Sequence, residues 1–223
     1  TTENAKNGKV VSLEIKNGSF VWNDLIMEDS NSIRGVNIIN NSIAVTYLED
    51  TFSKVKFYSL EGAYKESLSL SENGSISGFG GGLEDTSTFF SFTNFVSPKK
   101  IYEIDLNTMK MKIFWEESLK DFNSNDYISD FRFYESKDGT KIPIHINYKK
   151  SLSITEDTPV LIYGYGGFNI SILPSFSKRF LSWMNQGGVV ATRLSVRGED
   201  PDQIDFIYLA QNANERCAFR RGF

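Results

Sequence analysis

Residues 160 to 169, VLIYGYGGFN, run from four apolar side chains into three glycines that stand among aromatic residues. Glycine lets the backbone turn sharply and approach a ligand closely, whereas the phenol of Tyr165 adds a hydrogen-bond donor. A donor aimed at developing negative charge stabilises the oxyanion of an acyl-transfer reaction. The loop therefore points to one of two chemistries, phosphate binding by a glycine-rich backbone or oxyanion stabilisation in a hydrolase.

Nucleotide binding is the first alternative, because a buried strand that runs into glycines and then a helix is typical of a dinucleotide-binding fold. The G-x-G-x-x-G pattern from Gly164 would need glycine where Asn169 stands, and the Gly-Lys-Ser/Thr end of a P-loop is absent. Arg193, on the next apolar strand, could still contact the 2′-phosphate of NADP. Nucleotide binding stays open as the weaker alternative, and a thermal shift with NADP would test it.

A serine hydrolase needs a nucleophile, a histidine base and oxyanion donors. The G-x-S-x-G elbow is absent, since the nearest approach, GSISG from Gly74, has Ile76 at its centre. His145 is the only histidine, and alternation in IPIHINY places it opposite Ile144 and Ile146. We expect it on the less buried face of a strand. Its place before the glycine loop also breaks the serine, acid, histidine order of α/β-hydrolases, so it is not a credible base.

The first part of the chain, up to about residue 126, alternates short runs of strand-forming residues with turn residues, which predicts many short strands. Strands are expected at residues 10–15, 42–49, 54–61, 87–95 and 99–106. Similar decapeptides begin at Lys9, Lys54 and Lys99, in two steps of 45 residues. A period of 40 to 50 residues with about four strands per unit is typical of β-propeller blades. A β-sandwich is the alternative, but it predicts no constant period.

The pattern changes after about residue 126. Asp138-Gly139 between alternating apolar residues predicts a hairpin. Next come an apolar strand that enters the glycine loop, a helix within residues 175–188 that glycines end, and a second apolar strand from Gly188. Strand, loop, helix and strand in this order predict α/β architecture. We therefore expect two domains, a partial β-propeller of two to three blades at residues 1–126 and an α/β part at residues 127–223.

Composition excludes several function classes. The net charge of -4 gives no basic surface for nucleic acid. Cys217 is the single cysteine, so no internal disulfide can form, and without a Cys/His cluster no structural zinc site is expected. No apolar run of membrane-spanning length and no signal peptide is present, which favours a cytoplasmic protein without membrane contact. We expect no metal and no cofactor, and the sequence does not indicate an oligomeric state.

The run YGYGGFNIS from Tyr163, with SKDGTKIP from Ser136 before it and GGVV from Gly187 after it, resembles the prolyl oligopeptidases. These are cytosolic serine peptidases that cut short peptides after proline. The resemblance implies a seven-bladed propeller that caps an α/β-hydrolase domain, with the active site between them. It also implies that Tyr165 donates its hydroxyl to the oxyanion and that Phe168 lines the pocket for the proline ring. The alternative is that both side chains simply pack over the loop.

The resemblance ends after Arg197-Gly198, where this chain continues with Glu199-Asp200-Pro201-Asp202 instead of further glycines. In the family the nucleophile serine, the acid and the histidine all follow that point, so none of them can be assigned here. We expect a partial chain that serves an enzyme acting on short proline-containing peptides and is inactive alone. A different hypothesis is a catalytically dead protein that acts by binding peptides or partner proteins.

Overall fold

The computed structural model describes residues 1–135, 139, 141–165, 172–194 and 208–210. The chain divides into two compact units, one of residues 1–92 and 99–116 and the other of residues 93–98 and 117–223. The chain therefore passes between the units three times, after Phe92, after Pro98 and after Glu116. The short segment 93–98 belongs to the second unit, although both of its flanking strands lie mainly in the first.

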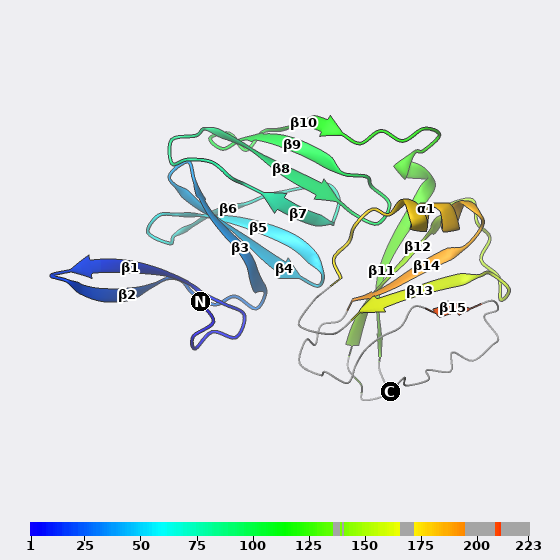
Figure 1. Cartoon of the computed structure of the whole chain (residues 1–223), viewed down its shortest axis with the longest axis horizontal. Helices are drawn as coiled ribbons and strands as arrows, with labels where there is room; N and C mark the ends of the chain where they lie inside the picture. The colour runs from blue at the N-terminus through cyan, green and yellow to red at the C-terminus, as the bar shows by residue number, and fades with distance from the viewer. Residues whose placement is uncertain (136–138, 140, 166–171, 195–207, 211–223) are drawn as a thin grey trace. The chain divides into compact units, whose positions relative to one another are not determined.

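The first unit consists of three sheets whose strands follow one another in sequence order (Figure 1). Its strands are β1 (Val10–Lys16) and β2 (Ser19–Ile26) in a hairpin, then β3 (Ser32–Ile39), β4 (Ser42–Glu49), β5 (Phe52–Ser59) and β6 (Tyr64–Ser67) in one four-stranded sheet, then β7 (Ser75–Gly78), β8 (Ser87–Thr93), β9 (Lys100–Asp105) and β10 (Met111–Glu116) in another. Asn17 and Gly18 join β1 to β2 with φ angles of 49° and 78°. Two positive φ angles in a two-residue turn match the right-handed twist of the flanking strands, which explains why Asn-Gly favours this hairpin.

The predicted repeat corresponds to one sheet per period. β1, β5 and β9 hold the same place in successive sheets, because each is followed by the last strand of its sheet. The decapeptides that begin at Lys9 and Lys99 contain β1 and β9, and the one that begins at Lys54 contains all of β5 except its first two residues. The predicted strands therefore coincide with observed ones, and the first unit contains two four-stranded repeats and a two-stranded part of a third.

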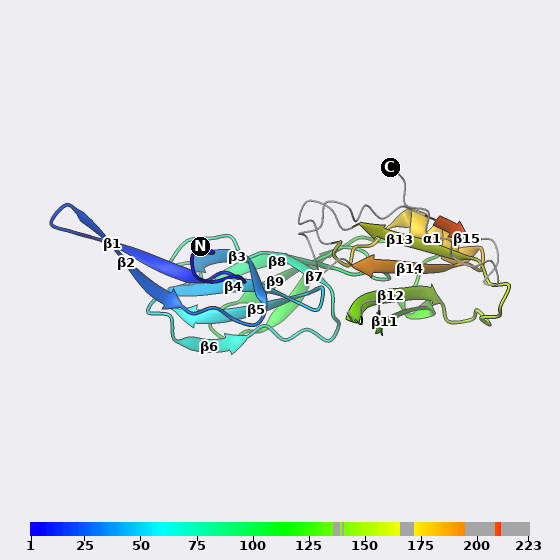
Figure 2. The ribbon, with the colours of Figure 1, turned by 90° about the horizontal axis from the view of Figure 1, so that it is seen from below.

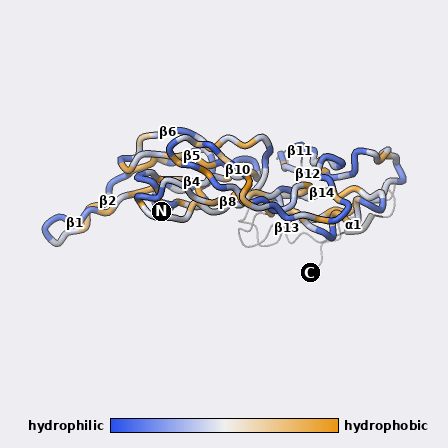
Figure 3. The backbone as a smooth tube through the Cα atoms, turned by 90° about the horizontal axis from the view of Figure 1, so that it is seen from above, coloured by the Kyte–Doolittle hydropathy of each residue, from blue (hydrophilic) through white to orange (hydrophobic). Residues whose placement is uncertain are grey.

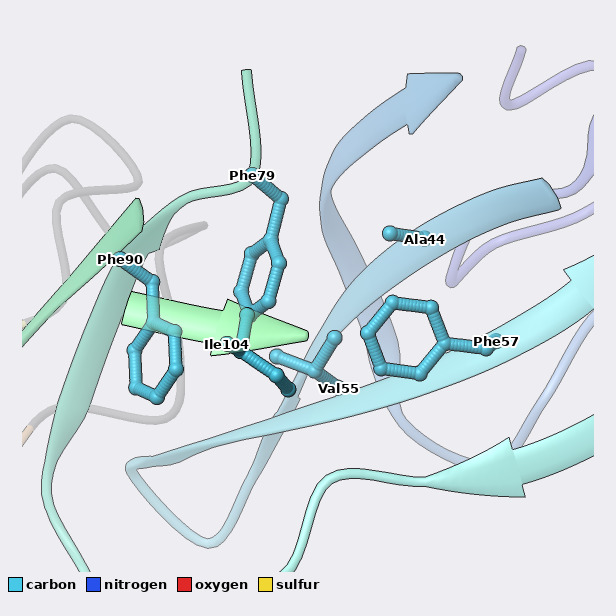
Figure 4. Close-up of a cluster of buried hydrophobic side chains, with 6 residues drawn as sticks. All are labelled: Ala44, Val55, Phe57, Phe79, Phe90 and Ile104. Carbon is cyan, nitrogen blue, oxygen red and sulfur yellow. The ribbon is translucent and has the colours of Figure 1, made fainter. Parts of the chain in front are cut away.

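The sheets of the first unit bury their faces against one another. Between the two four-stranded sheets lies a core of Ala44, Val55, Phe57, Phe79, Phe90 and Ile104 (Figure 4). The rings of Phe79 and Phe90 stack with centroids 5.1 Å apart, and Phe57 meets Phe79 edge to face at 5.7 Å. A second core joins the other face of the β3–β6 sheet to the first hairpin and contains Ile26, Ile43, Val45, Tyr47 and Tyr58. The β3–β6 sheet is thus covered on both faces, as a blade within a row of blades is.

The outer sheets expose large apolar side chains. On the first hairpin Phe20 and Trp22 are exposed, and on the last sheet Phe114 and Trp115 are exposed. Phe114 meets the ring of Phe89 edge to face at 4.9 Å and is still 63% exposed. Such surfaces are the ones that neighbouring blades cover in a complete propeller, because each blade is buried only by its neighbours.

The second unit is built on a mixed five-stranded sheet with the strand order β11-β12-β14-β13-β15 (Figure 2). After the 3-10 turn η1 (Ser124–Asp126), its elements are β11 (Tyr127–Glu135), β12 (Lys141–Lys149), β13 (Val160–Tyr165), α1 (Lys178–Asn185), β14 (Val189–Leu194) and β15 (Tyr208–Ala210). β13 and β14 run parallel, and α1 lies between them in the chain. Parallel neighbours need a crossover connection, and this helix supplies it.

The predicted elements after residue 126 are observed where the structure describes them. β11 and β12 pair antiparallel, and Gly139 between them has φ +79°, whereas the rest of the predicted turn, residues 137, 138 and 140, lies outside the described residues. The predicted helix is α1, and Gly187 follows it with φ +85°. A positive φ just after a helix is the usual reason for glycine at that position.

Hydrophobic and hydrophilic stretches alternate along the chain (Figure 3). Among the described residues, no helix combines the length and the apolar character needed to cross a membrane.

Candidate functional site

The glycine loop begins at the carboxyl end of a parallel strand pair. In the register of β13 and β14, Gly164 pairs with Arg193 and Tyr165 with Leu194. In open α/β sheets, ligands bind beyond the carboxyl ends of the parallel strands. The backbone of Tyr165 therefore lies at the edge of the sheet where a binding site is expected.

The two predicted site residues differ in how much the structure describes. Tyr165 is the last residue of β13, and only its backbone is described. Phe168 lies outside the described residues, as does the whole of segment 166–171. The oxyanion role of Tyr165 and the pocket role of Phe168 therefore stay predictions. Arg193, considered for a nucleotide phosphate, is partly buried beside Gly164 in the sheet.

The helix that follows the loop is fixed on the sheet by its apolar side. Met184 is buried with Val190 of β14 in one cluster, and the ring of Phe180 lies 5.9 Å from that of Tyr163 on β13. The indole Nε1 of Trp183 donates a hydrogen bond to the carbonyl oxygen of Val189 at 3.0 Å. This arrangement holds the helix against both strands whose ends border the glycine loop.

The return from α1 to β14 requires glycine at position 188. A Cβ atom at Gly188 would lie 2.2 Å from the indole Nε1 of Trp183. No side chain fits in that space, so the close contact between the helix and the start of β14 depends on this glycine. The glycine pair at 187 and 188 thus has two separate tasks, a positive φ and a close approach.

His145 lies on the more buried face of β12, so the expectation that it occupies the less buried face was wrong. Its exposed fraction is 2%, and the neighbours on the same face, Pro143 and Asn147, are buried as well. Its ring lies 4.8 Å from that of Phe95 and 4.9 Å from that of Phe131. Burial lowers the pKa of His145 from 6.5 to about 4, because a charged imidazole loses its hydration there.

The cause of this burial is the segment 93–98, which the sequence interpretation treated only as the end of a strand. Phe95 covers His145, and Val96 packs against the cluster that contains Met184 and Tyr127. The side-chain oxygen of Asn94 accepts hydrogen bonds from the backbone N–H of Val96 at 2.9 Å and of Ser97 at 2.7 Å. An Asx turn of this kind could have been suspected from Asn94 followed by Ser97-Pro98, but the sequence gives no sign of its docking site.

The residues that leave the glycine loop are held by the same segment. The backbone N–H of Phe176 donates a hydrogen bond to Oγ1 of Thr93 at 3.3 Å. The ring of Phe176 meets that of Phe122 edge to face at 5.4 Å. Two residues later, Nζ of Lys178 forms an ion pair with Glu117 at 3.0 Å. Sequence reasoning did not find these contacts, since the partners are far apart in the chain.

In the described part of the chain no group of three or more His, Cys, Asp or Glu side chains could hold a metal ion.

Two curated relatives match nearly the whole chain. A prolyl endopeptidase of Elizabethkingia meningoseptica is 36% identical over 199 residues, which is 89% of this chain and 28% of that protein. Prolyl oligopeptidase A of Galerina marginata is 33% identical over 203 residues, again 89% of this chain and 27% of that protein. The chain thus spans little more than a quarter of the length of these relatives.

Solved structures agree with the curated relatives. A structure from a study of two prolyl endopeptidases and their inter-domain dynamics matches with a TM-score of 0.79 at 30% identity, over 90% of this chain and 30% of that one. Prolyl oligopeptidase B from Galerina marginata, bound to a 35mer hydrolysis and macrocyclization substrate, matches with a TM-score of 0.80 at 28% identity, over 88% of this chain and 28% of that one.

The family model described as "Prolyl oligopeptidase, N-terminal beta-propeller domain" matches residues 1–117, which are the residues that build the three sheets. The β-propeller prediction for the first part of the chain is confirmed by this match, and the β-sandwich alternative is dropped. The family model covers the repeats of the first unit, and the relatives cover most of this chain, including the motif at the glycine loop. This chain therefore belongs to the prolyl oligopeptidase family.

Proposed function

We propose that this chain is a segment of a serine endopeptidase that hydrolyses short peptides after proline. Its second unit would be the N-terminal part of an α/β-hydrolase domain, and the division near residue 126 would separate that part from the propeller. The parallel strands β13 and β14 with α1 between them support this assignment. The names of the relatives, which are prolyl endopeptidases and prolyl oligopeptidases, support the reaction class.

The observation that carries the proposal is the position of Tyr165. Its backbone ends β13 at the carboxyl edge of the parallel pair, directly before the glycines. A phenol at that edge could reach a substrate carbonyl and stabilise the negative charge that forms on its oxygen. Phe168, three residues later in the same loop, would line the pocket for the proline ring. Both roles require a nucleophile serine and a histidine base that this chain does not supply, so the chain alone would be inactive.

The proposed setting is the cytoplasm. A single cysteine, Cys217, and the absence of any cysteine pair fit a protein that works in a reducing compartment.

A chimaera tests the proposal. In the prolyl endopeptidase of Elizabethkingia meningoseptica, this chain would replace the 28% of the protein that it matches, and hydrolysis of a proline-containing fluorogenic peptide would be measured. We expect activity in the chimaera and a fall in kcat of about 100- to 1,000-fold in its Tyr165→Phe variant, since one oxyanion donor is lost. Tyr163→Phe is the matched control, because it removes a hydroxyl from the same strand two residues earlier. An active chimaera whose kcat survives Tyr165→Phe would refute the proposed role of Tyr165.

A further inference from the structure

Two residues at which the chain enters its second unit contact one short stretch of that unit, residues 176–178. Thr93 is the first residue of the second unit after one passage, and Glu117 is the first after another. Thr93 accepts a hydrogen bond from the backbone of Phe176, and Glu117 pairs with Lys178. Phe176 and Lys178 stand between the glycine loop and the body of α1. Thr93 and Glu117 therefore both contact the stretch that follows the loop after Tyr165.

The contact at Thr93 is part of a built arrangement. The Thr93 hydroxyl accepts from Phe176 N–H at 3.3 Å and donates to the carbonyl oxygen of Ser97 at 3.0 Å, so that its one proton and one of its lone pairs are both used. Bonds in such a chain polarise and strengthen one another. The backbone N–H of Asn94 donates to the same Ser97 oxygen at 3.2 Å, which closes the turn. Its other acceptor within reach, the carbonyl oxygen of Asn94 at 3.5 Å, belongs to the same turn, so the turn directs the hydroxyl.

The turn itself has little freedom to move. Phe95 packs on buried His145, and Val96 lies in the cluster below α1. Ser97 is only 1% exposed. Buried Phe95 and half-buried Val96 hold the turn in place and so fix the position from which Thr93 reaches Phe176.

Segment 172–177 is also held by contacts of its own side chains. The Phe176 ring rests edge to face on Phe122, which in turn stacks on Tyr127 at 5.3 Å at the start of β11. Pro174 is buried and has a fixed φ angle. Segment 172–177 is thus tied by a backbone hydrogen bond, a ring contact and an ion pair at the first residue of α1, although it has no regular secondary structure.

We propose that Thr93 is a positioning residue: through the backbone of Phe176 its hydroxyl fixes segment 172–177, which follows the glycine loop, and it thereby supports the geometry in which Tyr165 acts. The contact itself is independent of the enzymatic role of the loop. Its effect on catalysis rests on the proposed function. A site held by such supporting contacts loses rate when its geometry shifts by a fraction of an ångström.

Amide hydrogen exchange of the full chain tests the contact without any activity. In Thr93→Val the acceptor is lost at nearly unchanged volume, and we expect exchange at residues 172–177 to rise about fivefold to tenfold, the effect of one lost hydrogen bond. Thr93→Ser keeps the hydroxyl and should restore the slow exchange. Thr88→Val is the matched control, since it removes a hydroxyl that donates to Gly80 in the first unit. Unchanged exchange at 172–177, or an equal rise in all segments of the chain, would overturn the positioning role.

Kinetics of the chimaera then separate this role from the proposed function. Thr93→Val should lower kcat at an almost constant KM, and Thr93→Ser should restore it, because the loop would bind substrate but hold the oxyanion donor out of place. An active chimaera whose kcat is the same in Thr93→Val and in the unchanged chain would overturn the catalytic consequence. An inactive chimaera with the exchange difference intact would count against the proposed function and leave the positioning role supported.

Discussion

The single histidine makes the second unit sensitive to pH in a defined direction. The pKa of His145 falls from 6.5 to about 4 on folding, because its ring is buried between Phe95 and Phe131. Between these two pH values the unfolded chain binds a proton that the folded chain does not, so the free energy of unfolding decreases as the pH falls. The difference between these two pKa values corresponds to about 3 kcal/mol of stability, which is fully present above pH 6.5 and lost by about pH 4.

The residues that pack on His145 or lie opposite it in the strand register are uncharged. Segment 93–98, which covers it, contains no ionisable side chain. The residue opposite on β11 is Phe131 and the residue opposite on β14 is Thr192, whereas Asp130, Arg132 and Arg193 alternate to the other face of the sheet. Desolvation by burial is the cause that lowers the pKa of His145.

Two measurements check the value. Because the chain has one histidine, its imidazole Cε1 proton gives a single NMR signal, and we expect that signal to titrate near pH 4 and not near 6.5. The free energy of unfolding should be measured in urea at several pH values between 8 and 4.5, for the unchanged chain and for His145→Phe. As the pH falls, the unchanged chain should lose more stability than the variant, by up to about 1.4 kcal/mol for each pH unit. Phenylalanine keeps an aromatic ring between the same two neighbours, so the carboxylates titrate alike in both proteins.

The reasoning is refuted by either of two results. A histidine signal that titrates near pH 6.5 would mean that the ring is hydrated in solution and that segment 93–98 does not cover it. Parallel stability curves for the unchanged chain and for His145→Phe would mean that burial of the imidazole contributes nothing to the pH dependence.

Two predictions concern the stability of the first unit, each measured by urea unfolding. Gly62→Ala should lower the free energy of unfolding by roughly 2 to 4 kcal/mol, because φ is +85° and a Cβ would lie 2.0 Å from the carbonyl oxygen of Leu25. The control Gly18→Ala, with φ +78° and open space around it, should lower it by only about 1 kcal/mol. Equal losses in the two variants would contradict the clash at Gly62. Phe90→Ala should lower the free energy of unfolding by about 3 to 5 kcal/mol, because the side chain is 1% exposed in the core between the sheets. Phe89→Ala, at a side chain that is 45% exposed, should lower it by less than about 1.5 kcal/mol. The reverse order would place the core on the other face of β8.

Much of the fold could be predicted from short-range patterns. The repeat that starts at Lys9, Lys54 and Lys99 predicted one sheet per 45 residues, since each sheet of the first unit is made of strands that follow one another in the chain. The helix before Gly187 and the strands on each side of it were predicted for the same reason, because apolar spacing and the glycine stop are local signals.

The candidate site could be predicted only in part. The motif around Tyr165 gave its position in the chain, and the parallel pairing of β13 with β14 gave its position on the sheet edge. The contact between Thr93 and Phe176 joins residues 83 positions apart, and nothing in either neighbourhood announces it. A single hydroxyl in a turn has the same local pattern whether it faces solvent or supports a loop.

The sequence alone determined that β12 has two unlike faces, one with Ile144 and Ile146 and one with His145, because side chains alternate in a strand. It could not determine which face is covered. That was decided by the turn at residues 93–98, which belongs to the second unit although its flanking strands lie in the first, and which buries the polar face. The physical reason is that burial depends on whichever segment packs there in three dimensions, and alternation carries no information on a partner 50 residues away in the chain.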